Sequence, residues 1–142
     1  MWQVKEAEEA YGQVKDRLKG LNGKDMKTRY LFGLPFVSID FYGKETEFIM
    51  DTGFNGDLML PKSTVEDLQL MSMGFVQYEM ADGTYADAEI YAADMAWLGT
   101  QRRVGVVAVD TDLMLLGMEL LQDCKLILEP RKDILSIEKS LA

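Results

Sequence analysis

The sequence contains no histidine among its 142 residues. Histidine is the usual general base of enzymes near neutral pH and the commonest protein ligand for metal ions. Its absence excludes Ser-His-Asp and Cys-His catalysis within this chain, together with every metal site that depends on imidazole. Any hydrolytic chemistry must therefore use carboxylates, lysine, or a metal held only by oxygen atoms.

Cysteine and long apolar runs are almost as scarce. Cys124 is the single cysteine, which rules out a disulfide within the chain and a cysteine-rich zinc site, and which fits a reducing compartment. No apolar run approaches the roughly 18 residues of a membrane span. The first residues, MWQVKEAEEAYG, lack the basic and apolar regions of a secretory signal. We therefore expect a cytoplasmic protein without a membrane partner.

Basic residues are few relative to acidic ones. The chain has 15 Lys and Arg against 24 Asp and Glu, which gives a formal net charge of −9. Nucleic acids are bound largely through Lys and Arg, so this balance argues against a nucleic-acid partner. With 48% hydrophobic residues the chain can bury a core, and its length is that of about one domain.

Residues 1–30 differ from the remainder and are predicted to form an N-terminal helical extension. Apolar residues recur there with the period of one helix face: Val4, Ala7, Tyr11, Val14, Leu18 and Leu21. Gly20 and Gly23 are positioned to end the helix. Two alternatives are open for this apolar seam: it packs on its own domain, or it packs on a partner chain.

Residues 31–142 form the second predicted unit, and their pattern is that of strands. LPFVSIDFYG and KETEFIM predict two strands joined at Gly43, and Asp82-Gly83 predicts a hairpin between FVQYEM and TYADAEIYAADMAWL. RRVGVVAVD predicts another strand, and CKLILE and DILSIE predict a last hairpin. Residues 63–66 have the pattern of a capping box and predict a short helix ending at Gly74; LLGMELLQD predicts a second. The spacing favours an all-β closed barrel over a parallel sheet.

A carboxylate, a hydroxyl and a glycine interrupt the apolar stretch FIMDTGFNGDLMLP, residues 48–61. The pattern places Asp51 at the point where a strand leaves the core. Thr52 offers a donor and an acceptor that can hold the loop, and Gly53 lets the backbone approach the carboxylate closely. On these residues alone, a catalytic loop and a capped turn between strands are both open.

Three stretches, in order along the chain, resemble the retropepsin-like (clan AA) aspartic proteases, in the branch whose loop reads Asp-Thr-Gly-Phe. FIMDTGFNGDLMLP resembles their active-site loop, and MADGTYADAEIY resembles the flap hairpin that closes over substrate. LMLLGMELLQDC resembles the segment that passes beside the catalytic loop and leads into a helix. The resemblance covers residues 34–138 and implies a closed acid-protease barrel with short helices, to which the N-terminal helix is an addition.

The resemblance also implies roles for individual residues. It assigns catalysis to Asp51, Thr52 and Gly53, the flap to Ala81, Asp82, Gly83 and Thr84, and the substrate cleft to Phe54, Leu116 and Gly117. Phe54 departs from the viral members, which usually carry a small alanine there. Taken alone, Asp82-Gly83 also fits an ordinary hairpin, and Leu116-Gly117 also fits core followed by a turn.

The chain has one Asp-Thr-Gly, so the resemblance implies a homodimer whose second catalytic carboxylate is Asp51 of the other copy. Two carboxylates in contact share one proton, because like charges oppose double ionisation. One carboxylate polarises the attacking water, and the protonated one donates a hydrogen bond to the peptide carbonyl. The expected activity is that of an aspartic endopeptidase acting on peptides or unfolded protein, with no cofactor or metal. The alternatives are a catalytically weak peptide-binding or regulatory module that keeps the fold, and a structural dimeriser built on the helical seam.

Overall fold

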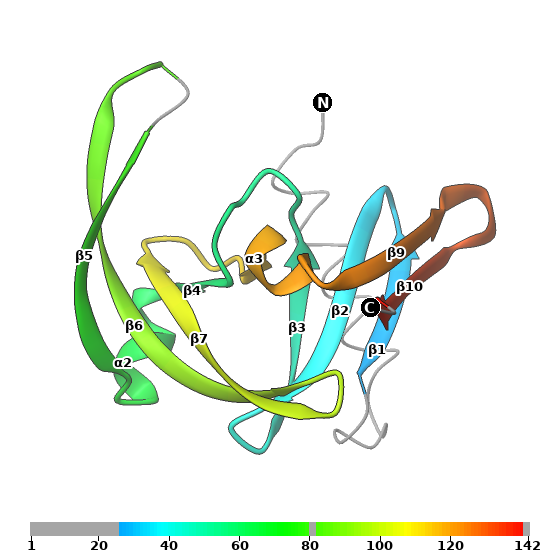
Figure 1. Ribbon diagram of the computed structural model, residues 1–142, viewed down its shortest axis with the longest axis horizontal. Coiled ribbons are helices and arrows are strands. Elements are labelled where there is room, and N and C mark those ends of the chain that lie inside the picture. Colours follow the sequence, from blue (N-terminus) through cyan, green and yellow to red (C-terminus); the bar gives the residue numbers. More distant parts are fainter. Residues whose placement is uncertain (1–25, 80–81, 141–142) are drawn as a thin grey trace.

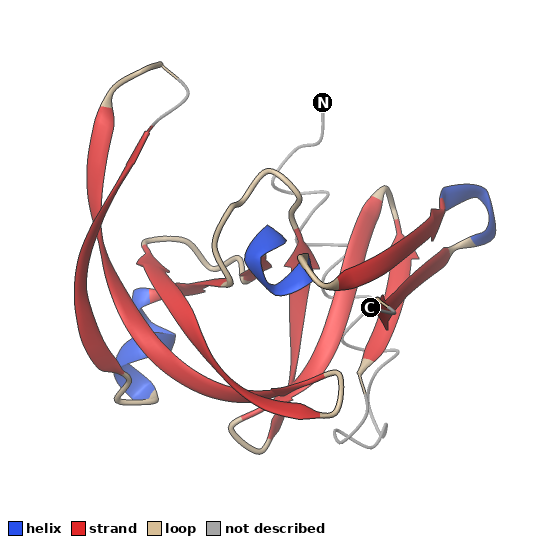
Figure 2. Cartoon of the chain, viewed as in Figure 1, coloured by secondary structure: helices blue, strands red, loops and turns tan. Residues whose placement is uncertain are grey.

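The computed structural model describes residues 26–79 and 82–140, and strands dominate it (Figure 1). Its strands are β1 (Lys27–Leu31), β2 (Leu34–Phe41), β3 (Lys44–Met50), β4 (Leu58–Pro61), β5 (Met71–Glu79), β6 (Tyr85–Trp97), β7 (Thr100–Val109), β8 (Leu115–Leu116), β9 (Cys124–Glu129) and β10 (Ile134–Lys139). Its helical segments are α2 (Lys62–Asp67), α3 (Met118–Leu121) and the 3₁₀ turn η1 (Pro130–Lys132), all short in Figure 2. Within these described ranges, no helix has the length and apolar character that crossing a membrane requires.

Eight strands form one sheet in the order β1-β2-β3-β8-β4-β7-β6-β5, and β9 and β10 form a separate two-stranded sheet. The described strands therefore form an open sheet rather than the predicted closed barrel, with β1 and β5 at its two ends. The turn residues predict hairpins between neighbouring strands, but closure requires pairing between distant strands, for which the sequence carries no local signal. The β9–β10 hairpin lies beside β1, where the hydroxyl of Thr28 donates to the carbonyl of Leu135.

The predicted N-terminal helix lies outside the described residues, except for its last residues. The predicted boundary between residues 30 and 31 falls inside β1, a strand that pairs with β2 along its whole length. The division into two domains stays a prediction.

The three predicted hairpins are confirmed: β2 pairs with β3, β5 with β6 and β9 with β10, all antiparallel. β6 also pairs with β7, antiparallel, where the sequence predicted a strand but no hairpin. Tyr42 and Gly43, between β2 and β3, both have positive φ (53° and 78°). This is the backbone of a two-residue primed turn, whose twist matches that of the flanking strands.

The helix after β4 is shorter than predicted. It begins at Lys62, directly after Pro61, and no side-chain hydrogen bond caps it. It ends at Asp67, and Gln69 (φ of 52°) turns the chain into β5. The predictions of a capping box and of an end at Gly74 are therefore wrong. Gly74 (φ of 106°) lies instead in a β-bulge of β5, where a glycine accepts a conformation that other residues resist.

The main core lies between the inward face of the large sheet, the helices and β10. Its most deeply buried members include Phe48, Leu58, Leu60, Val106 and Leu116, each with 0% exposure. Full burial of such a side chain contributes about 1.5–3 kcal/mol relative to leaving it in water. The core therefore fixes the ends of β3, β4 and β8, which carry the candidate site.

Candidate active site

The loop between β3 and β4, residues 51–57, wraps around the segment that contains β8. β8 lies between β3 and β4 in the sheet, parallel to β3 and antiparallel to β4. The backbone N–H of Asp51 donates to the carbonyl of Leu116 at 2.9 Å, and the N–H of Gly117 donates to the carbonyl of Asp57 at 2.8 Å. The sequence-based prediction that this segment passes beside the loop is confirmed, and both ends of the loop are held by backbone bonds.

Gly117 makes this passage sterically possible. A Cβ added to it would lie 2.5 Å from Cδ2 of Phe54 and 2.7 Å from the carbonyl oxygen of Phe54. Two further backbone bonds continue the contact, from Met118 N–H to the carbonyl of Phe54 at 2.8 Å and from Glu119 N–H to the carbonyl of Gly56 at 3.2 Å. The loop and the start of α3 therefore pack in contact, with no room for a side chain between them.

Asp51 begins a tight turn at the end of buried β3. Its carbonyl accepts the N–H of Phe54 at 3.1 Å, and its Oδ1 accepts the N–H of Gly53 at 2.8 Å. Asp51 is half-buried, whereas Thr52 and Gly53 are exposed. The turn thus fixes the carboxylate by a backbone donor and presents it at the surface of the molecule.

β5 and β6 form a long curved hairpin, whose tip lies at the same edge of the molecule as the loop of residues 51–57 (Figure 1). Near the tip, Oδ1 of Asp82 accepts the hydroxyl of Thr84 at 2.6 Å and its N–H at 3.0 Å. These bonds, the hydroxyl bond first, lower the pKa of the Asp82 carboxyl. Ala81, which was predicted as part of the flap, lies outside the described residues.

A cavity of about 640 Å³ separates the loop from this hairpin. Its lining comes from the loop and from β4, β5, β6 and β7: Gly53, Phe54, Asn55, Gly56, Met59, Val76, Glu79, Ile90, Val107 and Val109. The volume lies in the range of sites for small ligands or peptide side chains. Glu79 is the single charged residue among the described residues of this lining, so the described part of the cavity wall is mainly apolar.

The predicted site residues take different positions around this cavity. Gly53 and Phe54 line it, and Asp51 is two residues from Gly53. Leu116 has 0% exposure and Gly117 is buried. Both therefore pack against the buried side of the loop, and neither lines the cavity. Asp82, Gly83 and Thr84 are exposed at the hairpin tip, beyond the lining.

Sequence reasoning missed the strand residues that line the cavity. Val76, Ile90 and Val107 come from three adjacent strands, and Ile90 pairs directly with Val107. Cross-strand partners project from the same face of a sheet, but their partnership becomes visible only when the register is known. The alternation of apolar residues along each strand was the available signal.

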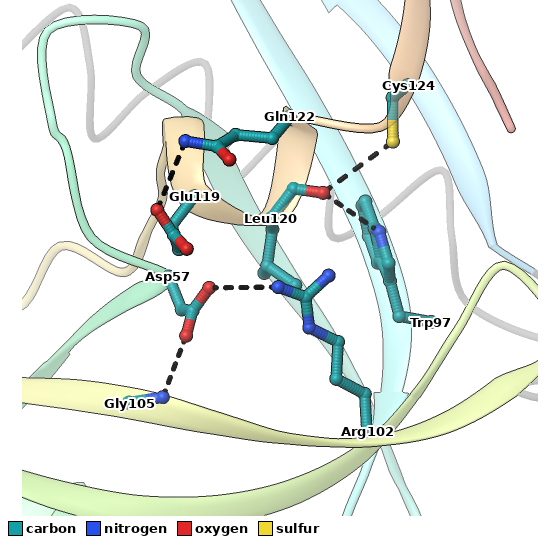
Figure 3. Close-up of polar contacts among 8 residues, drawn as sticks. All are labelled: Asp57, Trp97, Arg102, Gly105, Glu119, Leu120, Gln122 and Cys124. Atoms are coloured by element: carbon teal, nitrogen blue, oxygen red, sulfur yellow. Dashed lines mark hydrogen bonds and ion pairs between the residues drawn. The ribbon is translucent and has the colours of Figure 1, made fainter. Parts of the chain in front are cut away.

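Asp57, at the far end of the loop, is a second residue that the sequence analysis missed. Figure 3 shows its carboxylate between β7 and the loop: Oδ2 accepts the N–H of Gly105 at 2.9 Å, and Oδ1 lies 3.8 Å from a guanidinium nitrogen of Arg102. Its side chain is 13% exposed. This largely buried carboxylate, which accepts a backbone N–H, ties the loop to β7.

The carbonyl of Leu120 anchors α3 behind the site. It accepts the indole N–H of Trp97 at 3.1 Å and faces the thiol of Cys124 at 3.6 Å (Figure 3). Burial raises the pKa of the Cys124 thiol, so this cysteine is protonated and unreactive near neutral pH. The helix that follows Gly117 is therefore fixed to β6, and through it the loop is held in place.

No cluster of three or more Asp, Glu or Cys residues in the described ranges is arranged to hold a metal ion. The chemistry available at the loop is that of a carboxylate, a neighbouring hydroxyl and backbone N–H groups.

Comparisons with known proteins establish the fold. No protein-family model matches the chain, and no curated protein matches it. Among solved structures, it is similar to a retropepsin-like aspartic protease from Rickettsia conorii, with a TM-score of 0.52 and 22% identity over 80% of this chain and 88% of that chain. It is also similar to the foamy viral protease-reverse transcriptase in complex with an RNA/DNA hybrid, with a TM-score of 0.48 and 14% identity over 61% of this chain and 11% of that chain. On the first of these comparisons, the chain has a retropepsin-like fold.

Proposed function

We propose that this chain is one subunit of a homodimeric aspartic endopeptidase of the Asp-Thr-Gly-Phe branch, in which two Asp51 carboxylates, one from each copy, activate water. The observation that carries the proposal is the Asp51-Thr52-Gly53 turn, which ends a buried strand beside a cavity of about 640 Å³. The retropepsin-like fold supports it. Because one fold can host several functions, the residues of the loop carry more of the argument than the fold does.

The proposed reaction divides two roles between two identical side chains. The ionised Asp51 takes a proton from a water molecule as the water oxygen attacks the peptide carbonyl carbon. The protonated Asp51 of the other copy donates a hydrogen bond to the carbonyl oxygen. The C–N bond then breaks, and the departing amine takes the proton that the first Asp51 removed from the water. The 2.8 Å bond from Gly53 N–H to Oδ1 supports these roles, because it fixes the carboxylate in one orientation.

A second copy is required because each chain has one Asp-Thr-Gly. The exposure of Thr52 and Gly53 leaves the loop accessible to such a copy. In the proposed dimer the two loops meet on the symmetry axis, and each Thr52 hydroxyl braces the opposite loop. Two carboxylates in contact then share one proton, which supplies the acid and the base together.

The cavity indicates the kind of peptide that the site accepts. Phe54, Met59, Val76 and Ile90 give it apolar walls that suit a large apolar side chain next to the cleaved bond. The β5–β6 hairpin, which supplies Val76 and Ile90, acts as the flap over the bound peptide.

The substitution Asp51→Asn tests this function. It keeps the side-chain size and should leave the circular dichroism spectrum and the thermal unfolding midpoint nearly unchanged. Hydrolysis of an unfolded protein substrate at acidic pH should fall by at least about a thousandfold, as expected when an essential acid-base group is removed. Hydrolysis that persists in purified Asp51→Asn would contradict the proposal.

The alternative is a peptide-binding or regulatory module with little turnover. Phe54 favours it, because an aromatic ring stands in the cavity wall directly after the Asp-Thr-Gly turn. A peptide that binds both the wild-type protein and Asp51→Asn with equal affinity, and that neither protein cleaves, would select this alternative.

A further inference from the structure

One face of the three-stranded edge formed by β1, β2 and β3 points away from the main core. Cross-strand partners share a face of a sheet, and the registers identify its members: Leu31 with Leu34, Phe36 with Ile49, Ser38 with Glu47, and Asp40 with Glu45. We call these eight residues the outer face. The alternate residues Val37, Ile39 and Phe48 belong to the main core on the opposite face.

The outer face has an apolar half that is buried. Leu31, Leu34 and Ile49 are 8%, 7% and 6% exposed. Within the described ranges, the apolar side chains that pack in this cluster come from β1, β2, β3 and the segment of β8 alone: Leu31, Leu34, Phe36, Ile49, Leu113 and Leu115. A single layer of strands does not bury its own outward side chains, since a core needs two packed layers.

The other half of the outer face is polar and partly enclosed. Ser38 is 2% exposed, and its Oγ has no hydrogen-bond partner among the described residues. Asp40 and Glu45 are half-buried, and one carboxylate oxygen of each is buried without a hydrogen bond from the described part of the chain. Buried oxygens of this kind are costly unless donors or cations lie nearby. A second layer must therefore cover this face, and it must be apolar over one half of the face and basic over the other.

We propose that residues 1–25 of the same chain form this layer, as an amphipathic helix that lies along the outer face with its apolar seam inward. The seam from Val4 to Leu21 would span about 27 Å as a helix, and the eight residues of β2 span about 26 Å. The segment joins the sheet directly, because β1 begins at Lys27. A tethered segment also has a high effective concentration at a neighbouring surface.

The charges beside the seam match the two halves of the outer face. Glu8 flanks the first part of the seam, and Lys15 and Arg17 flank the second part. Lys27 pairs with Ser38, so the chain enters the sheet at the polar half. The second, basic part of the helix therefore lies over Asp40 and Glu45. In this arrangement the apolar seam packs on the outer face of its own subunit, so contact between two copies must come from other surfaces.

The test measures whether the outer face is covered. In a Cys124→Ala background, Ser38→Cys introduces one thiol on this face, and its reaction rate with Ellman's reagent reports access to it. The charge introduced by Leu18→Asp should break the seam contact and raise this rate at least about tenfold by local opening. The matched control Gln13→Asp, on the opposite side of the helix, should leave the rate within about twofold.

A milder pair of variants covers the case in which Leu18→Asp fails to fold. Lys15→Glu removes a cation beside the seam and should raise the thiol reactivity by several-fold, whereas Lys5→Glu on the opposite side of the helix should not. Equal reactivity of the thiol in all variants and in the parent would overturn the proposal, because the helical seam would then not be what covers the face. Protection that disappears when the parent is diluted below its dimer dissociation constant would also overturn it, because a second copy would then be the occupant.

Discussion

At the scale of single residues, Gly117 shows how closely the candidate active-site loop is packed. Its φ of −109° is accessible to any residue, so space rather than backbone conformation requires glycine here. The oxygen of Phe54 would lie 2.7 Å from an added Cβ, and that atom belongs to the backbone, which cannot move aside alone.

Gly117→Ala should therefore destabilise the protein by about 1–3 kcal/mol, as overpacking does, and should reduce peptide hydrolysis further by displacing the loop. Urea unfolding and initial rates on one peptide measure the two effects. Gly105→Ala is the matched control, because its Cβ would meet Ile90 at an ordinary 3.5 Å. Equal stability of the two variants would mean that the loop yields to the extra methyl group.

The negative charge of Glu79 should influence which peptide substrates the protein prefers. Among the residues that the structure describes, it is the one charged side chain in the lining of a mainly apolar cavity. A peptide with Lys beside its large apolar residue should be preferred over the same peptide with Glu, and Glu79→Gln should reduce this preference by about two- to fivefold, the value of an exposed ion pair. The ratio of kcat/KM values for the two peptides measures the effect. Glu138→Gln, an exposed acid on β10, should leave that ratio unchanged.

At the scale of elements, the tip of the β5–β6 hairpin is held by the two bonds from Thr84 to Asp82. These bonds lower the pKa of the Asp82 carboxyl, so they are fully present above its ordinary value of about 3.9 and are lost as the pH falls through the depressed pKa. The hairpin tip should therefore loosen only in acid.

Thr84→Val removes the hydroxyl bond, the larger cause, and should raise the pKa of Asp82 toward the ordinary value. NMR titration of the side-chain carboxyl carbons follows this directly. Asp94 provides an internal control, because its pKa is lowered by a hydrogen bond from Arg103 and should not respond. An unchanged Asp82 titration would show that the backbone bond alone holds the turn.

The elements differ in how far the sequence predicts them. β2 and β3 are predicted by local features of the sequence, namely the alternation of apolar and polar residues and the turn at Gly43. This prediction is confirmed. β8 has two residues, too few to show the apolar–polar alternation of a strand. It forms because β3 and β4 offer unpaired edges on either side of it. The same limit applies to the site: the Asp51 turn is visible in three residues, whereas the cavity wall from Val76 and Ile90 depends on registers between strands.

At the scale of the whole molecule, the proposed active site belongs to two chains. One Asp51 carboxylate has no partner with which to share a proton, so specific activity should fall as the protein is diluted below its dimer dissociation constant. This dilution effect separates a shared site from a complete site in each chain, but dilution can also unfold a subunit that is stable only as a dimer. A covalently linked pair removes that ambiguity.

The sharper experiment joins two copies in one polypeptide, with Asp51→Asn in one of them. The linked protein should be folded and compact, and it should have less than about a hundredth of the hydrolytic rate of the linked wild-type pair, because the loss of one member of an acid-base pair removes nearly the whole effect. Linked pairs with wild-type sequence in both copies, and with Asp51→Asn in both copies, set the upper and lower limits of the assay. If the mixed pair keeps about half of the wild-type rate, each chain contains its own complete site. The assignment of Asp51 to a shared dyad would then be wrong, although Asp51 begins a tight turn at the end of buried β3.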